Sequence, residues 1–392
     1  QFVSVQALWI LGAYGYFERQ NASGRVVEVW QSSLESMEVK KEFWKEKKVL
    51  ITGHTGFKGS WLSLWLQSLG ARVVGYSLPP PTNPSLFEVA NVADGMCSIN
   101  GDVRDIMQLK ATIVKYQPEI IIHMAAQSLV RYSYINPIET YTTNIIGTVN
   151  VLEAVRQIKA PSIVLIVTSD KCYQNNEWFW GYRENEPMGG NDPYSSSKGC
   201  AEIIVSAYRH SYFPVENYDQ HNVAIASARA GNVIGGGDWS NDRLIPDIIK
   251  AFMENRPVIV RNPKATRPWQ HVLEPLNGYL CLIENLWANT KEFSNGWNFG
   301  PSDDVQEVSW IVERMMELWG KGARWELDTG QNPHENKYLK LDCSKTKNIL
   351  KWSPKLNLTV TLDWIIKWYH GYQQNKDMRC YTESEISRYG KL

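Results

Sequence analysis

Short apolar runs alternate with amphipathic segments through the first half of the chain. Apolar residues at helical spacing predict helices over residues 60–69, 106–116 and 137–158. Short apolar runs bounded by glycine, proline or polar residues predict buried strands at residues 48–52, 72–76, 98–100, 120–124 and 162–168. This alternation predicts an α/β fold with a parallel, doubly wound sheet of the Rossmann type.

The pattern is looser after residue 200. It predicts strands at residues 223–228 and 258–260, and helices over residues 244–255, 308–319 and 360–372. We expect residues 37–222 to form the first domain, with a returning strand near residues 223–230. Residues 231–392 are expected to form mainly a smaller C-terminal α/β lobe.

Residues 1–36 differ from the rest of the sequence. The chain begins with Gln1, whereas Met37 opens a charged stretch just before the first predicted strand. The apolar stretch Phe2–Phe17 lacks a basic start and is short for a membrane span. We expect residues 1–36 to be leader or added sequence outside the fold, with a cleaved secretion signal as the alternative.

Composition narrows the classes of partner. The 392 residues carry 41 basic and 41 acidic side chains, so no overall field favours nucleic acid or an anionic membrane. The six cysteines show no CxxC spacing, which is typical of reduced thiols rather than of a disulfide framework or a zinc site. We therefore expect a cytoplasmic protein without a bound metal, in which local sites hold any anionic ligand.

A glycine-rich loop directly follows the first predicted strand. Its three glycines permit a tight turn and a close approach of the backbone to a pyrophosphate, and the next helix offers unpaired N–H groups. An ordinary turn is the alternative, but the strand before and the helix after favour dinucleotide binding. The expected cofactor contacts in this loop are Gly53, Thr55, Gly56, Phe57, Lys58 and Gly59.

The end of the second predicted strand bears on which dinucleotide is bound. Tyr76-Ser77-Leu78 stand where an acidic residue usually accepts the ribose 2′-hydroxyl of NAD, and no arginine is clearly placed for the 2′-phosphate of NADP. NAD is favoured, although no acidic residue secures it. Asp102 is a candidate contact for the adenine, or else a loop or N-cap residue.

A second polar group follows the strand predicted at residues 162–168. Ser169 lies at the carboxyl end of that strand, where open α/β sheets bind ligands. Tyr194 and Lys198 share a helix face, so the lysine charge can lower the pKa of the tyrosine. This set predicts proton and hydride transfer, and the adjacent Asp170 and Lys171 suggest further acid–base chemistry. A solvated helix face and a loop ion pair are the alternatives.

Basic residues recur in the second half of the sequence. Arg267 stands beside Trp269 and Gln270, and Arg243 and Arg261 precede them. An arginine binds a diphosphate through two parallel hydrogen bonds, so the set suggests a nucleotide-linked substrate. Taken singly, each arginine is better explained as a surface cation.

Over about residues 44–372 these motifs resemble those of the extended short-chain dehydrogenase/reductases. The matching segments are Gly53-xx-Gly56-xx-Gly59, His123-Met124-Ala125-Ala126, Asn144, Tyr194-xxx-Lys198 and Arg229-xx-Asn232-Val233. Within that family, residues 53–62 and Thr168-Ser169-Asp170-Lys171-Cys172-Tyr173 resemble the sugar-nucleotide 4,6-dehydratases of the CDP-glucose branch. Lys171 departs from the broader dehydratase pattern, which has Thr-Asp-Glu in place of Ser169-Asp170-Lys171.

The resemblance implies ligands and an assembly. It implies NAD, contacted also by Ala125, Ala126, Tyr194 and Lys198, and CDP-glucose as substrate, with residues 231–392 as the sugar-nucleotide domain. The substrate contacts expected from it and from the basic set are Gln127, Asn144, Asn232, Arg243, Arg261, Arg267, Gln270 and His334. It also implies a homodimer or a dimer-based tetramer formed through the helices near residues 137–158 and 194–212.

The implied reaction has three steps and no net redox change. Tyr194 takes the C4 hydroxyl proton, held by Ser169, while the C4 hydride passes to NAD; Lys198 supports Tyr194 and the nicotinamide ribose. Water is then lost across C5–C6, and the hydride returns to C6. The product is CDP-4-keto-6-deoxyglucose, a precursor of deoxysugars and O-antigens. We hypothesise that Lys171, once neutral, removes the C5 proton and that Asp170 protonates the leaving hydroxyl, with the reverse assignment open.

Two other functions stay open at this point. A sugar-nucleotide 4-epimerase or reductase would need Ser169, Tyr194 and Lys198 but not Asp170 or Lys171. A protein that kept the dinucleotide fold only for binding is disfavoured by the intact serine, tyrosine and lysine.

Overall fold

The computed structural model describes residues 19–20, 26–27, 38–158, 162–302, 306–320, 322–328, 330 and 339–392. The chain divides into two compact units, residues 1–36 and residues 37–392. In the first unit, β1 (Arg19–Gln20) pairs antiparallel with β2 (Val26–Val27). All elements described below belong to the second unit.

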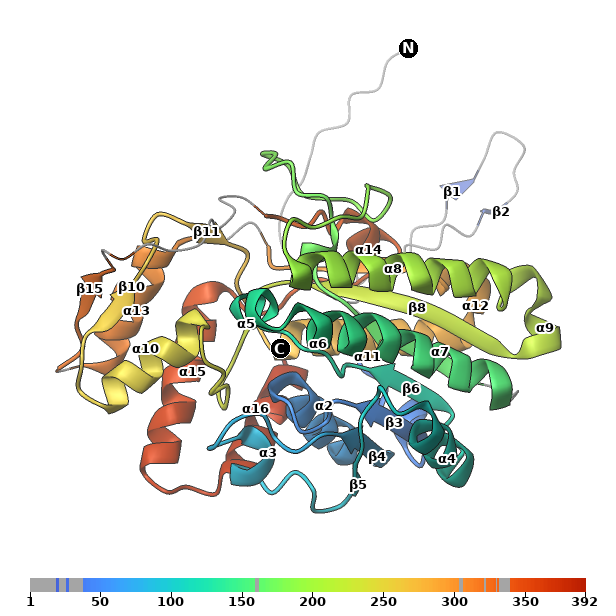
Figure 1. Ribbon diagram of the computed structural model, residues 1–392, viewed down its shortest axis with the longest axis horizontal. Coiled ribbons are helices and arrows are strands. Elements are labelled where there is room, and N and C mark those ends of the chain that lie inside the picture. Colours follow the sequence, from blue (N-terminus) through green and yellow to red (C-terminus); the bar gives the residue numbers. More distant parts are fainter. Residues whose placement is uncertain are drawn as a thin grey trace, which may run out of the picture. The chain divides into compact units, whose positions relative to one another are not determined.

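A seven-stranded parallel sheet forms the centre of this unit (Figure 1). In spatial order its strands are β13 (Gly296–Phe299), β8 (Val223–Ala230), β7 (Ser162–Val167), β6 (Ile120–His123), β3 (Lys48–Thr52), β4 (Arg72–Ser77) and β5 (Cys97–Asn100). The chain runs outward in both directions from β3 and β6, so the topological switch point lies between them. The predicted doubly wound α/β fold is confirmed.

Helices cover both faces because the central strands are apolar on both sides. Along β3, Val49 and Ile51 pack into one core and Leu50 packs into the other. The first core is shared with α2 (Phe57–Ser68), α11 (Leu273–Ala288), α15 (Leu358–Gln373) and α16 (Met378–Gly390). The second is shared with α4 (Ile106–Tyr116), α7 (Gly147–Ile158) and α8 (Pro193–Ser211).

A smaller α/β lobe lies to one side of the sheet, at the left of Figure 1. It contains α10 (Leu244–Met253), α13 (Val308–Trp319), and the parallel pair β10 (Val258–Val260) and β15 (Trp325–Leu327). Two further pairs are β9 (Val233–Ile234) with β12 (Gln270–His271), and β11 (Thr266–Arg267) with β14 (Gln306–Glu307). The sheet strand β13 lies between lobe elements in the sequence, so the chain returns to the main sheet before it forms β14, α13 and β15 of the lobe.

The remaining elements are short connections. The helices are α1 (Lys41–Trp44), α3 (Leu86–Val89), α5 (Val130–Ile135), α6 (Pro137–Tyr141), α9 (Tyr218–His221), α12 (Thr290–Phe293) and α14 (Ser344–Asn348). A π-helical turn (Thr142–Ile146) joins α6 to α7, and 3-10 turns cover Asp170–Cys172 and Val215–Asn217. The helix predicted over residues 137–158 is therefore three consecutive segments. None of the described helices combines the length and apolar character needed to cross a membrane.

One buried carboxyl in α16 gives the fold a dependence on pH. Glu385 is 7% exposed, and within the described structure its Oε2 atom has no hydrogen-bond partner. Burial raises the pKa of Glu385 from 4.5 to about 8. Between these values the folded chain holds a proton that the unfolded chain has lost, so this group lowers the free energy of unfolding as pH rises through that window.

We expect Glu385→Gln to stabilise the fold at about pH 8 by up to a few kcal/mol, at about 1.4 kcal/mol per unit of pKa difference. Near the acid end of the window the gain should vanish, because the native carboxyl is then neutral too. Denaturant unfolding of both proteins at several pH values measures the difference. A stability difference that stays constant across the window would contradict this prediction.

Candidate active site

The glycine-rich loop after β3 is packed against backbone. Gly53 has φ +80°, and a Cβ there would lie 2.7 Å from the backbone nitrogen of Ala125. A Cβ on Gly59 would lie 2.1 Å from the carbonyl oxygen of Gly53. Gly56 is the N-cap of α2, and no side chain caps the first turn of that helix. The loop therefore leaves helix N–H groups available for a pyrophosphate, and its residues fit a dinucleotide.

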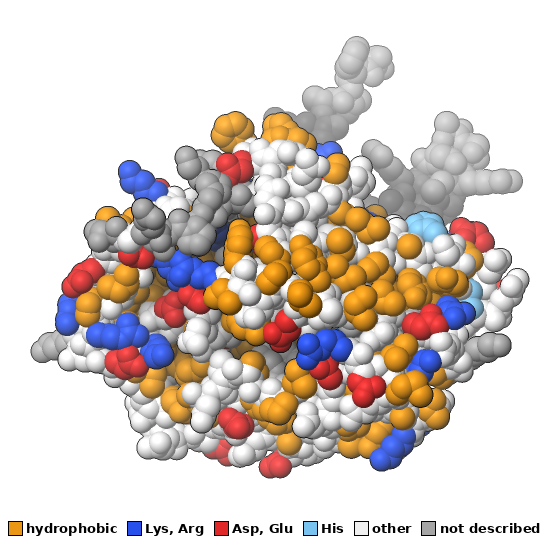
Figure 2. Space-filling model, viewed as in Figure 1, with side chains coloured by type: hydrophobic (Ala, Val, Ile, Leu, Met, Phe, Trp, Pro, Cys, Tyr) orange, Lys and Arg blue, Asp and Glu red, His pale blue; other side chains and the backbone are white. Residues whose placement is uncertain are grey.

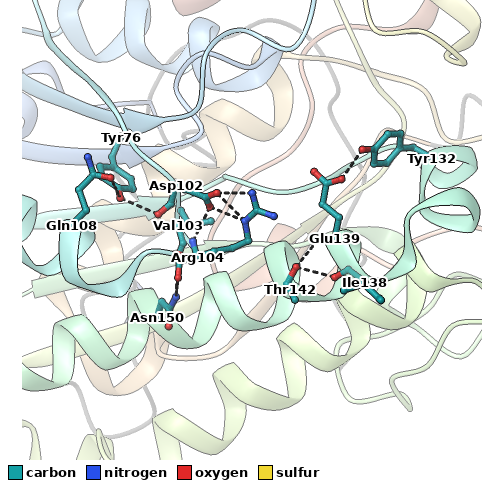
Figure 3. A network of polar contacts seen from close by, with 10 residues as sticks. All are labelled: Tyr76, Asp102, Val103, Arg104, Gln108, Tyr132, Ile138, Glu139, Thr142 and Asn150. Carbon is teal, nitrogen blue, oxygen red and sulfur yellow. Dashed lines mark hydrogen bonds and ion pairs between the residues drawn. The ribbon is translucent and has the colours of Figure 1, made fainter.

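Hydroxyl groups and a fixed carboxylate mark the expected ribose and adenine end. The Thr55 Oγ1 atom lies 2.9 Å from the Ser77 Oγ atom at the end of β4. Arg104 donates to the Asp102 carboxylate at 2.8 Å from Nε and 2.6 Å from NH2 (Figure 3). Burial alone would raise the pKa of Asp102, but these hydrogen bonds lower it below its usual value. Asp102 is thus a loop carboxylate held ionised by Arg104, while Asp105 is the N-cap of α4.

Lys58 points across the fold toward α11. Its Nζ atom donates to the Tyr279 hydroxyl at 3.0 Å. Burial lowers the pKa of Lys58 to about 7, with further lowering by the charges of Lys198 and Arg243 and an opposing effect of Asp170. The lysine of the glycine-rich loop therefore belongs to the charged interior of the candidate site.

The segment after β7 carries the polar groups of the expected centre. The Ser169 hydroxyl donates to Asp170 Oδ1 at 2.9 Å, and the Lys171 Nζ atom lies 3.5 Å from the same oxygen. Asp170 is fully buried, whereas the Lys171 side chain is 30% exposed. A Cβ on Gly231 would lie 2.0 Å from Asp170 Oδ2, so only glycine there leaves room for this carboxylate. Within the described structure this second oxygen has no hydrogen-bond partner.

Tyr194 and Lys198 lie in the first two turns of α8. Asp192 caps the helix by accepting a hydrogen bond from the Ser195 nitrogen, and the Tyr194 nitrogen donates to the Ser133 hydroxyl. Tyr194 is 8% exposed and Lys198 is 6% exposed. Both reactive side chains are therefore held in a buried, preorganised helix end.

The protonation of this pair differs from what the sequence predicts. Burial raises the pKa of Tyr194 to about 12, which a hydrogen bond with Ser169 lowers only in part. Burial also lowers the pKa of Lys198 to about 8. Desolvation of Tyr194 outweighs the lowering by the Ser169 hydrogen bond and by the charge of Arg243. The net shift in the pKa of Tyr194 therefore runs opposite to the lowering that the sequence predicts from Lys198.

Three of the expected substrate contacts make hydrogen bonds within the protein. Asn144, in the π-helical turn, accepts from the Gln127 nitrogen at 2.8 Å and donates to the Gln127 carbonyl and to the Ser197 hydroxyl. The Gln270 amide donates to the Gly231 carbonyl at 3.1 Å and to that of Phe299 at 2.9 Å. These residues tie the loops around the site to one another.

The predicted basic set lies near carboxylates of the smaller lobe. Arg243 bonds Asp238 at 2.9 Å and donates to the Ser128 hydroxyl at 2.8 Å. Arg261 lies 3.5 Å from Asp242 and 3.9 Å from Asp247, and burial raises the pKa of Asp247 to about 6. Arg267 donates a hydrogen bond to the carbonyl of Thr266. The backbone of Asn232 adopts φ +45°. His334 lies outside the described residues.

Sequence reasoning missed Glu202, which is buried in α8 and receives three hydrogen bonds. It follows Lys198 by four residues and Tyr194 by eight, so the three side chains share one helix face. This spacing of four residues places Glu202 on the same helix face as Tyr194 and Lys198, and it could have identified Glu202 from the sequence. In the described part of the chain, no group of three His, Cys, Asp or Glu residues could hold a metal ion.

The arrangement supports two kinds of chemistry at one strand end. Ser169 can hold a hydroxyl and Tyr194, as the phenolate, can deprotonate it, which is what oxidation of an alcohol to a ketone requires. Asp170 and Lys171 add a second acid–base pair directly beside them. A site with only the first pair would exchange a hydride, whereas the second pair can also serve an elimination.

Comparisons with known proteins identify the family. A sequence profile of the family described as GDP-mannose 4,6 dehydratase matches residues 50–363. The CDP-glucose 4,6-dehydratase of Salmonella typhimurium is 56% identical over 352 residues, which cover 90% of this chain and 98% of the relative.

Two solved structures share the fold. The UDP-glucose 4-epimerase of Thermotoga maritima, solved with UDP-glucose, has a TM-score of 0.71 at 20% identity and covers 83% of this chain and 99% of its own. The dTDP-glucose 4,6-dehydratase of Bacillus anthracis, solved with NAD, has a TM-score of 0.68 at 22% identity. The match covers 84% of this chain and 98% of the Bacillus chain. At these identities they show the fold alone. The profile match and the Salmonella relative carry the assignment: the chain belongs to the GDP-mannose 4,6-dehydratase family, within the extended short-chain dehydrogenase/reductases.

Proposed function

We propose that the protein is an NAD-dependent 4,6-dehydratase that converts CDP-glucose into CDP-4-keto-6-deoxyglucose for deoxysugar biosynthesis. The observation that carries the proposal is the Asp170–Lys171 pair beside Ser169 and Tyr194. The identity to the Salmonella relative supports CDP-glucose as the substrate. The reduced state expected for the cysteines supports a cytoplasmic location.

NAD fits the loop of Gly53 and Gly59, whose backbone leaves no room for larger side chains. When bound, NAD supplies a hydride acceptor for C4 and returns the same hydride to C6. Ser169 would hold the C4 oxygen while Tyr194, once ionised to the phenolate, takes the hydroxyl proton. Lys198, buried in the next turn of α8, would lie beside the nicotinamide ribose and supply positive charge.

The ion pair after Ser169 already contains the proton that elimination requires. One proton shift from Lys171 to Asp170, across 3.5 Å, leaves a neutral amine and a neutral carboxylic acid. The amine then takes the C5 proton as the C6–O bond breaks, and the acid protonates the departing hydroxide to give water. The pair ends as it began, with an ammonium and a carboxylate. The reverse assignment, with the Asp170 carboxylate as base and the Lys171 ammonium as acid, balances equally, so the variants below test Lys171 as the base and Asp170 as the acid.

A single incubation tests the reaction class. We expect purified protein with NAD and CDP-glucose, but no reductant, to yield a product lighter by one water, with no net change in the cofactor. Mass spectrometry measures the loss, and parallel dTDP-, GDP- and UDP-glucose incubations test the base. An unchanged mass with C4 inverted would indicate the epimerase, and turnover of none of these sugars would refute the proposal.

Replacement of Lys171 tests whether this residue is the base of the elimination. We expect Lys171→Met to keep C4 oxidation while overall turnover falls by roughly 10²- to 10⁴-fold, the range for loss of a general acid or base. Reduced nicotinamide should accumulate, and solvent deuterium should fail to enter C5. Lys355→Met, at a lysine outside the site, is the matched control. Full elimination with deuterium at C5 in Lys171→Met would contradict the assignment of the base.

We also propose that the enzyme is a homodimer, or a tetramer built from such dimers. Exposed apolar side chains gather over α5–α8, and Figure 2 shows them as a band across this face. The members of this helical face are Ile135, Ile138, Tyr141, Ile146, Ile203 and Tyr212. Ile135 and Ile138 are each 78% exposed, which is costly for two neighbouring apolar residues unless a partner covers them.

A charge on this face tests the assembly. We expect Ile203→Arg to shift the protein to a monomer in analytical ultracentrifugation, because an arginine in an apolar contact would lose its hydration. Ile259→Arg in β10 is the control, since Ile259 is 50% exposed but lies outside the helical face. An assembly unchanged by Ile203→Arg, or lost equally in both variants, would count against this face.

A further inference from the structure

A buried ion pair lies beneath the candidate site. Arg229 on β8 and Glu202 on α8 are 5% and 4% exposed, and the NH2 atom of Arg229 lies 2.8 Å from Glu202 Oε2. Burial alone would raise the pKa of Glu202, but Arg229 and three donated hydrogen bonds lower it below its usual value. The carboxylate is therefore ionised inside the protein, where such a pair seldom adds net stability over apolar side chains.

The contacts of the pair enclose the turn that carries Asp170 and Lys171. Ahead of the turn, the Thr168 hydroxyl donates to Glu202 Oε1 at 2.5 Å. Behind it, the NH1 atom of Arg229 donates to the Tyr173 hydroxyl at 2.6 Å. The residues two positions before Asp170 and two positions after Lys171 are thus both tied to the same pair.

The pair also fixes the elements that surround this turn. The Ser227 hydroxyl of β8 donates to Glu202 Oε2 at 2.8 Å, which holds α8 against the strand that leads to Gly231. Gly231 is the residue that packs directly on the Asp170 carboxylate. A shift of β8 relative to the turn would therefore displace the Asp170 carboxylate first.

Tyr194 shares α8 with Glu202, but it has further supports at the start of that helix. Asp192 caps its helix, and the backbone nitrogen of Tyr194 donates to the Ser133 hydroxyl in α5. Neither contact involves the ion pair. Loss of the bonds to Thr168 and Tyr173 should therefore move Asp170 and Lys171 more than it moves Tyr194.

We propose that Glu202 and Arg229 are positioning residues for the elimination step, which hold Asp170 and Lys171 in register with the sugar that Tyr194 has helped to oxidise. This inference rests on the proposed 4,6-dehydratase function. It predicts that weakening the contacts of the pair slows water loss more than oxidation at C4, so the two steps become uncoupled.

The test cuts the two contacts without breaking the ion pair. Thr168→Val removes one hydroxyl. Tyr173→Phe removes the other, which also donates to Asn298 Oδ1 at 2.7 Å, and the double variant removes both. The matched controls are Thr382→Val and Tyr389→Phe, which delete buried hydroxyls between α15, α16 and α11. With CDP-glucose and NAD, single-turnover absorbance follows reduced nicotinamide, mass spectrometry follows water loss, and NMR in deuterated water follows C5.

We expect the rate of water loss to fall roughly tenfold in each single variant and further in the double variant, since misplacement of about 1 Å can cost 10²-fold. The rate of C4 oxidation should fall less than the rate of water loss, because Tyr194 keeps its own contacts although Ser169 lies in the same turn, so reduced nicotinamide accumulates. The controls should behave as wild type does. Glu202→Gln should show the largest uncoupling, provided circular dichroism shows it folded.

Two results would overturn the inference. Equal falls in oxidation and water loss would show a general structural role, and unchanged kinetics in the folded double variant would show that the contacts do not position the turn. Wild-type protein measured alongside separates these failures from that of the proposed function. If wild type does not release water from CDP-glucose, the dehydratase proposal itself fails.

Discussion

The register of the parallel sheet is the constraint on which the candidate site depends. Thr52 of β3 pairs with His123 of β6, and β7 pairs through Val167 with Ala228 of β8. Because parallel strands end at the same edge, this register brings the glycine-rich loop, the Ala125 segment, Ser169 and Gly231 together. The Thr52 hydroxyl fixes this edge further. It lies 2.7 Å from the His123 Nδ1 atom and accepts hydrogen bonds from the backbone nitrogens of Met124 and Ala125. A slip of one residue in any of these pairs would turn the reactive groups to the opposite face.

Because these segments meet at one edge of the sheet, positively charged side chains gather in the candidate site. Lys198 and Arg243 both lie within electrostatic reach of Lys58, where Asp170 opposes their effect, and Arg243 is also paired with Asp238. Burial works against each lysine charge, so the pKa of Lys58 is lowered to about 7 and that of Lys198 to about 8. An anionic ligand would offset this cost by supplying charge of the opposite sign. The site is thus better suited to a diphosphate-bearing substrate and cofactor than to a neutral sugar.

Local patterns predicted most of the sheet because its strands are short, apolar and bounded by turns. The predicted bounds of residues 48–52 and 106–116 match β3 and α4. The same apolar pattern predicted the strand that ends just before Ser169, Asp170 and Lys171. Helix α11 was missed because it is buried on nearly all sides, with Glu274, Asn277 and Glu284 among its buried residues, which leaves no clear apolar stripe opposite a polar face. Glu202 and the raised pKa of Tyr194 depend on burial by distant segments, which no local pattern records. The division of residues 37–392 into two domains stays a prediction.

The fold alone does not select the reaction. The epimerase from Thermotoga maritima superposes at a TM-score of 0.71 and the dehydratase from Bacillus anthracis at 0.68, so two different activities share this architecture equally well. What distinguishes them must lie in a few side chains near the hydride. In this chain Asp170 and Lys171 occupy a turn fastened at both ends to a buried ion pair, and Gly231 leaves the space that Asp170 fills. A buried charge pair is a costly way to stabilise a core, but its directional hydrogen bonds can fix a turn in a way that apolar packing cannot.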